Sequence, residues 1–220
     1  MLSDGEVDRL RTAAEEASWL CARGYPALEV ARFIAEHRGL SPRERILLDA
    51  IARADAHHRH HIARELDPDD VAGRPLRLDV ASVCANVAAS IAATFDPRIV
   101  LFESAAGLIG TAEVAPEVLA VHEPEALRRI AEVVLTLGPS AVRIVHDAAS
   151  LEHADALRKL LSGKRKPTVV CEEVPSVAAR LRGAAFVASA SPEVLDHCGT
   201  WFNLAGILVK ALGVTALRLG

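Results

Sequence analysis

The stretch AAFVASASPEVLDHCGTWFN, residues 184–203, is the strongest indication of the fold of this chain. It opens with the apolar run 185–188, which has the length of a buried strand and is too short for a helix. Ser189 and Ser191 follow, and Pro192 then fits the first position of a helix that Ser191 caps. Open α/β sheets build their sites where a buried strand ends in small polar groups at the start of a helix. The stretch therefore predicts an α/β sheet with a site at this turn.

The chain beyond residue 75 repeats this alternation of short apolar runs and amphipathic segments. The runs predict strands at 76–80, 99–102, 142–145, 168–171, 184–188 and 214–217. The segments between them predict helices at 82–94, 124–137, 150–161, 174–181 and 192–211, the last with a break near Gly199. Residues 103–124 fit neither pattern. Such alternation is typical of a parallel sheet with helices on both of its faces.

The N-terminal part has a different pattern, because its apolar residues recur at helical spacing and no strand is expected before residue 70. Helices are predicted at 4–22 and 26–37, and a third begins with the N-cap and proline pair Ser41-Pro42. The Asp-, Pro- and Gly-rich segment 67–75 then marks a boundary. We therefore expect an all-helical module at 1–67 and an α/β domain at 75–220.

Composition narrows the functional classes. The net charge of −4 argues against a strong, generic nucleic-acid binder. The four cysteines form no CxxC pair, which is typical of reduced thiols and predicts a cytoplasmic protein. No apolar run reaches the length of a membrane span, and the acidic N-terminus lacks the character of a signal peptide. The Ala-rich helices and the apolar segment 201–212 are compatible with a homo-oligomer.

The candidate site residues lie where the predicted strands end. One strand ends at Asp79, with Ser82 three residues on, and a second ends at His146-Asp147. If these strands are neighbours, Asp79 and Asp147 converge and can hold Mg²⁺ or Mn²⁺, which prefer oxygen ligands and can activate water. The alternative is that both carboxylates cap helices or accept backbone hydrogen bonds at strand ends.

Three further clusters have a functional and a structural interpretation. The His-rich segment 57–61 has helical spacing that could hold zinc or nickel, but a solvated helix end is favoured. The basic run 164–166 indicates a solvated loop, with phosphate contact as the alternative. The aromatic pair Trp201-Phe202 is interpreted as a core or interface anchor in preference to a base-stacking platform. Cys198 lacks a base that faces it, which argues against a nucleophile.

Two N-terminal segments, WLCARGYP at 19–26 and LSPRER at 40–45, resemble the helical module of the family labelled domain of unknown function four-three-four. The C-terminal part, most closely at 187–204, resembles the PIN-like domain that accompanies this module. PIN-like domains generally cleave RNA through acidic residues that hold a divalent metal at strand ends. The resemblance implies that Asp79 and Asp147 would be such residues, with Asp196 as a further acid.

The chain departs from the family pattern at three places, one of which is the flanks of Asp147, where His146 and Ala148-Ala149 stand. Val80-Ala81-Ser82 stands where the family usually has Gly-Phe-Asn after the first aspartate. Ser189-Ala190-Ser191 stands where it normally has Ser-Asp-Ser, so the chain lacks one carboxylate of the set. The departures indicate a degenerate member of the family.

Three functions follow as hypotheses. The first is a PIN-like scaffold with a binding or regulatory role towards a protein, RNA or a small molecule. The second is a Mg²⁺- or Mn²⁺-dependent ribonuclease-like hydrolase that uses Asp79, Asp147 and Asp196. The third is another enzyme that reuses the pocket through the His146-Asp147 pair and the hydroxyls of Ser189 and Ser191. The missing carboxylate favours the scaffold, because in-line displacement usually needs more negative charge around its metal ions.

Overall fold

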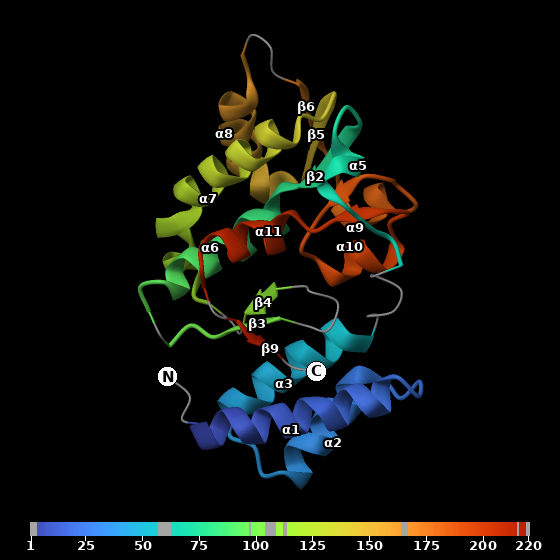
Figure 1. The fold of residues 1–220 in the computed structure, drawn as a ribbon, viewed down its shortest axis with the longest axis vertical. Helices are drawn as coiled ribbons and strands as arrows, with labels where there is room; N and C mark the ends of the chain where they lie inside the picture. Colours follow the sequence, from blue (N-terminus) through green and yellow to red (C-terminus); the bar gives the residue numbers. More distant parts are fainter. Residues whose placement is uncertain are drawn as a thin grey trace.

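The computed structural model of the chain describes residues 4–56, 63–96, 98–103, 109–111, 114–163, 167–214 and 216–218. Helices at the N-terminus precede a parallel sheet with interleaved helices (Figure 1). This confirms the expected fold class, a helical region followed by an α/β sheet. Within the described residues, every helix is too short or too polar to cross a bilayer.

The N-terminal helices pack on one another around their own core. They are α1 (Asp4–Cys21), α2 (Ala27–His37) and α3 (Pro42–Ala56). Leu10, Ile34 and Ile51 are among the side chains buried between them. The start of α3 has the expected capping box, since the Ser41 amide donates to Glu44 Oε2 at 2.8 Å and the Glu44 amide donates to Ser41 Oγ at 3.3 Å.

The central sheet has six parallel strands in the described part of the chain, in the order β1-β8-β7-β2-β5-β6. The strands are β1 (Glu65–Leu66), β2 (Pro75–Asp79), β5 (Ala141–His146), β6 (Thr168–Glu173), β7 (Val187–Ala188) and β8 (Trp201–Phe202). Side chains of register partners share a face of the sheet, and successive residues alternate between faces. Leu78 and Ile144 are register partners on the first face, and Arg77 and Arg143 are partners on the second.

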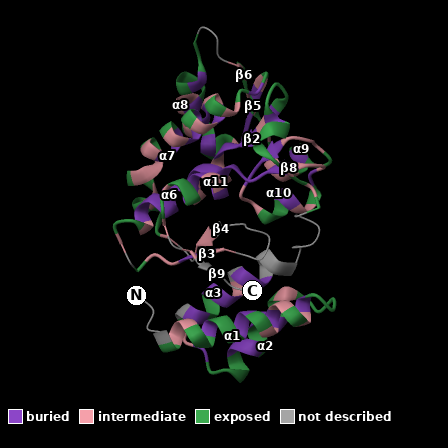
Figure 2. Cartoon of the chain, viewed as in Figure 1, coloured by how far each residue is buried: buried purple, intermediate pink, exposed green. Residues whose placement is uncertain are grey.

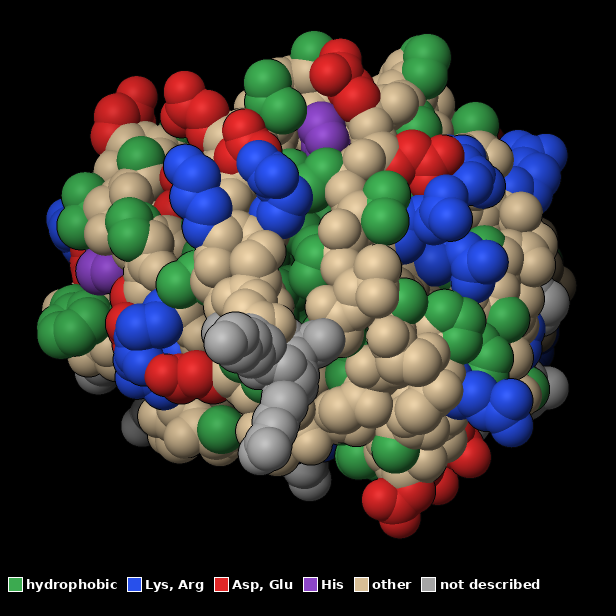
Figure 3. Space-filling view, turned by 90° about the horizontal axis from the view of Figure 1, so that it is seen from above, with side chains coloured by type: hydrophobic (Ala, Val, Ile, Leu, Met, Phe, Trp, Pro, Cys, Tyr) green, Lys and Arg blue, Asp and Glu red, His purple; other side chains and the backbone are tan. Residues whose placement is uncertain are grey.

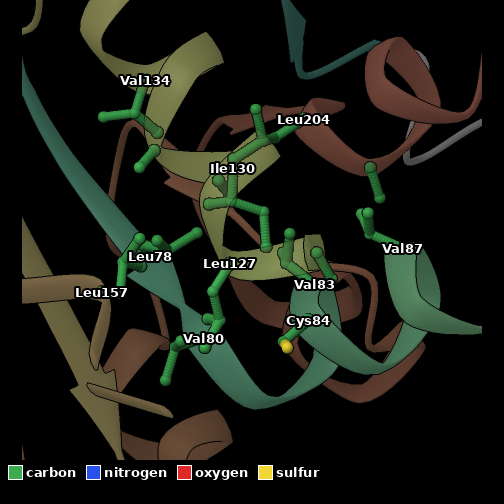
Figure 4. Packing of buried hydrophobic residues seen from close by; sticks show 14 of the residues in the cluster. Leu78, Val80, Val83, Cys84, Val87, Leu127, Ile130, Val134, Leu157 and Leu204 are labelled. Atoms are coloured by element: carbon green, nitrogen blue, oxygen red, sulfur yellow. The ribbon is translucent and has the colours of Figure 1, made fainter. Parts of the chain in front are cut away.

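Four helices cover the first face and form the main core with it. They are α6 (Val80–Ala93), α7 (Pro116–Leu137), α8 (Leu151–Leu161) and α11 (Leu204–Ala211). Figure 4 shows Leu78 of β2 among Leu127 and Ile130 of α7 and Leu157 of α8. All four side chains are at most 4% exposed, so this layer is dry. Burial of such side chains is the main source of stability for the sheet.

Two short helices cover only part of the second face. They are α9 (Val177–Leu181) and α10 (Pro192–His197), which bury Val145, Val187 and Trp201. Further along β5 and β6, Arg143 and Val170 of the same face remain exposed. The prediction of helices on both faces is therefore correct for the first face and for one part of the second.

A small second sheet joins the N-terminal helices to the rest of the chain. It has the order β4-β3-β9, from strands at Ile109–Thr111, Leu101–Glu103 and Leu217–Arg218. Figure 1 shows it between α3 and the helices of the larger sheet. Phe102 of β3 is 4% exposed and packs in the core of the N-terminal helices. Buried residues thus occur on both sides of this sheet (Figure 2).

Several element boundaries differ from the sequence prediction. Strand β1 lies before residue 70, where no strand was expected. The break expected near Gly199 is confirmed, and it contains a further strand, β8, between α10 and α11. Helix α7 begins at Pro116, eight residues before the predicted start at Pro124, which lies inside the helix. The ambiguous segment 103–124 contains β4 and this first part of α7. Short strands and an internal proline are decided by tertiary pairing and packing, which local patterns do not encode.

The contact between β3 and β4 gives a test of this arrangement. A Cβ atom added at Gly110 would lie 2.7–2.8 Å from two ring atoms of Phe102, so the ring would have to leave the core of the N-terminal helices. We expect Gly110→Ala to lower the free energy of unfolding by about 1–3 kcal/mol in urea denaturation, as overpacking does. Gly5→Ala is the matched control, because no atom lies within 4 Å of its added Cβ. A Gly110→Ala variant as stable as the parent protein would contradict the packing of Phe102.

Candidate functional site

The turn that contains Asp79 and the turn that contains Ser189 meet at the point where the helices that follow the strands change from one face of the sheet to the other. Strands β2 and β7 are parallel neighbours, with Leu78 beside Ala188, so both turns lie at the carboxyl-end edge. The helix after β2 packs on the first face, whereas the helix after β7 packs on the second. Such a change of side is the topological switch point, the place where open α/β sheets bind ligands. The structure thus brings Asp79, Ser82, Ser189 and Ser191 together, as the sequence predicts.

The Asp79 carboxylate accepts hydrogen bonds from both turns. Its Oδ2 atom lies 2.6 Å from Ser82 Oγ and 2.6 Å from Ser189 Oγ. Its Oδ1 atom accepts from the Ser82 amide at 3.3 Å, which makes Asp79 the N-cap of α6. Asp79 is 3% exposed and Ser189 is 2% exposed. One buried carboxylate oxygen therefore receives two hydroxyl groups from separate segments of the chain.

The proton count fixes the direction of these hydrogen bonds. A serine hydroxyl has one proton to donate and two lone pairs to accept with. Ser82 Oγ accepts the Ala190 amide at 3.0 Å, and Ser189 Oγ accepts the Ser191 amide at 3.0 Å. Each hydroxyl is therefore free to give its single proton to Asp79 Oδ2. The 3.1 Å contact between the two hydroxyl oxygens then needs no proton of its own.

This network fills the switch point with side chains of the chain itself. Ser82 joins the Asp79 carboxylate to the Ala190 amide, so the β2–α6 turn is bonded to the β7–α10 turn. Buried polar networks in which each member has a partner rigidify their surroundings. A ligand at this point would have to displace the serine hydroxyls from Asp79. The arrangement is that of a structural clasp, a name that we use below for Asp79, Ser82 and Ser189.

Asp147 lies at the same edge but belongs to a second group of contacts. Its Oδ1 atom accepts from the Ser150 hydroxyl at 2.6 Å and from the Ser150 amide at 3.0 Å. These bonds cap the short helix Ala148–Ser150, and the Ser150 hydrogen bond lowers the pKa of the Asp147 carboxyl. Asp147 also lines a hollow of about 390 Å³ with Glu173 and Pro175, on the β6 side. The clasp, by contrast, lies on the β7 side of β2.

The remaining predicted site residues lie elsewhere. His146 is buried, with Nδ1 3.0 Å from the Asp147 carbonyl oxygen, on the face of the sheet that Ile144 shares. Asp196 lies near the far end of α10, where the His197 carbonyl accepts the Gly183 amide ahead of β7. Helix α10 thus leads away from the clasp. In the described part of the chain, no three His, Cys, Asp or Glu side chains are placed to hold a metal ion.

The other sequence clusters have clear outcomes where the structure describes them. Trp201 and Phe202 are at most 1% exposed, which confirms the prediction of core anchors. Cys198 is buried, and burial raises the pKa of its thiol, so it lacks the character of a reactive cysteine. The His-rich segment 57–61 and the basic run 164–166 lie outside the described residues. Sequence reasoning missed Glu173 beside Asp147, because the pairing of β5 with β6 places it there.

Removal of one clasp hydroxyl tests the network. We expect Ser189→Ala to lower the free energy of unfolding by about 1.5–3 kcal/mol, because a buried carboxylate loses a charge-assisted hydrogen bond. Ser191→Ala is the matched control two residues away, since the Ser191 side chain makes no cap hydrogen bond to α10. Urea denaturation of both variants measures the difference. A Ser189→Ala variant as stable as Ser191→Ala would contradict the clasp.

The depressed pKa of Asp147 predicts a pH dependence. A carboxyl whose pKa is lower in the folded state contributes stability above its unfolded pKa, and this contribution is lost as the pH falls through the folded pKa. We expect Ser150→Ala to destabilise the protein by about 0.5–2 kcal/mol at pH 7, as loss of a cap does. The difference from the parent protein should shrink in acid, where Asp147 is protonated in both. A difference that stays constant down to the folded pKa would contradict this role of Ser150.

Comparison with known proteins adds one finding. A family model described as protein of unknown function (DUF434) matches residues 9–64, which include most of α1 and all of α2 and α3. No curated protein and no solved structure matched the chain. The chain therefore carries a DUF434 domain at residues 9–64, and the match ends where the parallel sheet begins.

Proposed function

We propose that the chain is a binding or regulatory scaffold, in which a PIN-like α/β domain has turned its acidic site into a structural element. The observation that carries this proposal is the clasp. Asp79, the residue that would lead a PIN-like metal site, directs one oxygen at two serine hydroxyls and caps α6 with the other. A carboxylate in that arrangement orders two turns of the fold.

The residues present do not fit the Mg²⁺ or Mn²⁺ ion that a PIN-like site would hold. Hard cations gather several oxygen ligands, and carboxylates supply the negative charge. Asp79 Oδ2 already receives two hydroxyl protons, which a cation would have to displace. Ala190 offers a methyl group at the position where a third carboxylate is expected, and Asp147 Oδ1 caps its own turn. The donor set therefore favours the scaffold over the hydrolase.

The hydrolase alternative also relies on Asp196, and its position weakens that alternative. The far end of α10 contacts the segment that precedes β7, as the hydrogen bond from the Gly183 amide to the His197 carbonyl indicates. Asp79 and Asp147 lie at the opposite, carboxyl-end edge of the sheet. Water activation between these three acids would need them on one edge.

Where the protein works, and with what, is part of the same proposal. Within the described residues, no disulfide joins the thiols of the protein, and this supports a reducing, cytoplasmic location; the thiols are those of Cys21, Cys84, Cys171 and Cys198. RNA, a small molecule, a protein or a second copy of the chain are the partner classes that the sequence suggests. Because the clasp fills the switch point, a partner of the scaffold would bind at another surface of the protein.

Restoring the missing carboxylate tests the proposal. We expect the parent protein to bind no Mn²⁺ in calorimetric titration at millimolar metal and to leave a single-stranded RNA intact. Ala190→Asp places a carboxylate beside the clasp, and we expect it to gain measurable Mn²⁺ affinity, with or without RNA cleavage. Ser191→Asp is the control, because it adds the same charge one residue further along, at the N-cap of α10.

Two results would overturn the scaffold. The first is cleavage of RNA by the parent protein in Mg²⁺ or Mn²⁺ that Asp79→Asn abolishes. The second is Mn²⁺ binding by the parent protein that equals the binding by Ala190→Asp. Either result would favour the hydrolase. Circular dichroism of each variant establishes that it has folded before the titration is interpreted.

A further inference from the structure

The part of the second sheet face that α9 and α10 leave uncovered forms a basic surface. It consists of Pro75 and Arg77 of β2, Ala141 and Arg143 of β5, and Thr168 and Val170 of β6, and we call it the open strip. The register places Arg77 beside Arg143, and Arg143 beside Val170, on one face of the sheet. Val170 is 48% exposed and the Arg143 side chain is 45% exposed.

The open strip is unusual for a parallel sheet. Parallel sheets are generally covered on both faces, and their strands are apolar as a result. Here the covering helices have only five and six residues, and their contacts reach Val145, Val187 and Trp201. The residues on the strip are correspondingly less apolar than Leu76, Leu78 and Ile144 on the covered face. A segment that covers the strip must therefore present both apolar and polar side chains to it.

The charge of the strip is positive. Arg143 Nη1 and Arg180 Nε of α9 share one acid, at 2.9 Å and 2.6 Å from the Glu172 carboxylate. Arg77 Nη1 donates to the Ala185 carbonyl at 2.7 Å, and because this partner is neutral, the contact does not balance the positive charge of Arg77. Figure 3 shows Lys and Arg side chains gathered beside an acidic group, next to apolar side chains, on the side where α9 lies in Figure 1. Glu172 is thus the one acid in these contacts for three cations, Arg77, Arg143 and Arg180, so the region keeps an excess of positive charge.

We propose that the open strip docks an acidic, amphipathic α-helix of a partner protein. Two strand spacings make the strip about 10 Å wide, which matches the diameter of one helix. An apolar stripe on that helix would cover Val170 and Ala141, and Glu or Asp side chains beside the stripe would meet Arg77 and Arg143. Arginine forms paired hydrogen bonds with a carboxylate, so the charges also fix the position of the helix.

The observations favour a helix over a nucleic-acid strand. Proteins that bind single strands combine basic residues with aromatic rings on which the bases stack. The six residues of the strip include no aromatic side chain. The inference goes beyond the proposed function, because it holds whether or not the switch point retains any activity.

Fluorescence anisotropy with a synthetic helix tests the proposal on the full chain. The probe is a labelled, hydrocarbon-stapled peptide with a Leu/Ala stripe flanked by Glu, since short unstapled helices are marginal in water. The comparison peptide carries Lys in place of each Glu. We expect the Glu peptide to bind with a Kd below about 100 µM and the Lys peptide to bind at least tenfold more weakly.

Variants then locate the binding surface. We expect Arg143→Glu to raise the Kd of the Glu peptide about tenfold or more, because it replaces attraction with repulsion. Val170→Asp should act in the same direction, because it places an acid in the apolar part of the strip, beside Arg143. Lys159→Glu is the matched control, since it reverses an exposed charge on α8, which packs on the opposite face of the sheet. This control should change the Kd less than twofold.

Four outcomes would overturn the proposal. The first is a Glu peptide that binds no tighter than the Lys peptide, and the second is an equal Kd for Arg143→Glu and Lys159→Glu. The third is binding of a single-stranded RNA that depends on Arg143, without binding of the Glu peptide. The fourth is a dimer in sedimentation experiments that Arg143→Glu dissociates. The third would identify a nucleic-acid surface, and the fourth an interface between copies of this chain. Each leaves the Ala190→Asp experiment unaffected, so the two proposals fail separately.

Discussion

The hydrogen bonds that Asp79 accepts from Ser82 and Ser189 are the interaction on which the centre of this structure depends. They connect the end of β2 to the end of β7, two strands that are far apart in the sequence. The carboxylate is buried, and an unpaired charge there would be strongly unfavourable. The two serines therefore stabilise the buried carboxylate, and the carboxylate in turn fixes the positions of the two serines. Loss of either serine would leave the buried Asp79 carboxylate with one hydroxyl partner fewer.

The same interaction limits what the site can do chemically. A carboxylate that serves as a metal ligand or general base needs a lone pair directed at the reacting atoms. Oδ2 of Asp79 directs its lone pairs at hydroxyl protons, and Oδ1 faces the first turn of α6. Asp147 is held in a comparable way by Ser150, at the start of the following helix. Both acids thus follow the capping interpretation that the sequence left open beside the metal site.

Sequence patterns predict that Asp79 and Ser189 lie at one edge of the sheet, but they do not predict that Ser82 and Ser189 both donate to Asp79. Parallel strands end at a common edge, and Asp79 and Ser189 each stand directly after an apolar run. The direction of α10, which carries Asp196 away, depends on how its far end contacts the Gly183 segment. The two-residue strand β8 depends likewise on tertiary pairing, with Trp201 facing one core and Phe202 the other. The open strip was missed because Arg77 and Arg143 become neighbours only once the register is known.

The sign of the stability change in Asp79→Asn, measured by urea denaturation without added metal, distinguishes a clasp from a metal site. In a clasp, Oδ2 of Asp79 accepts both hydroxyl protons and Oδ1 accepts the Ser82 amide, so the NH₂ group of an asparagine would face a donor in either orientation, and we expect a loss of about 1.5–3 kcal/mol in the free energy of unfolding. In a metal site that awaits its cation, neutralising one acid would relieve repulsion between carboxylates. A variant that is as stable as the parent, or more stable, would contradict the account.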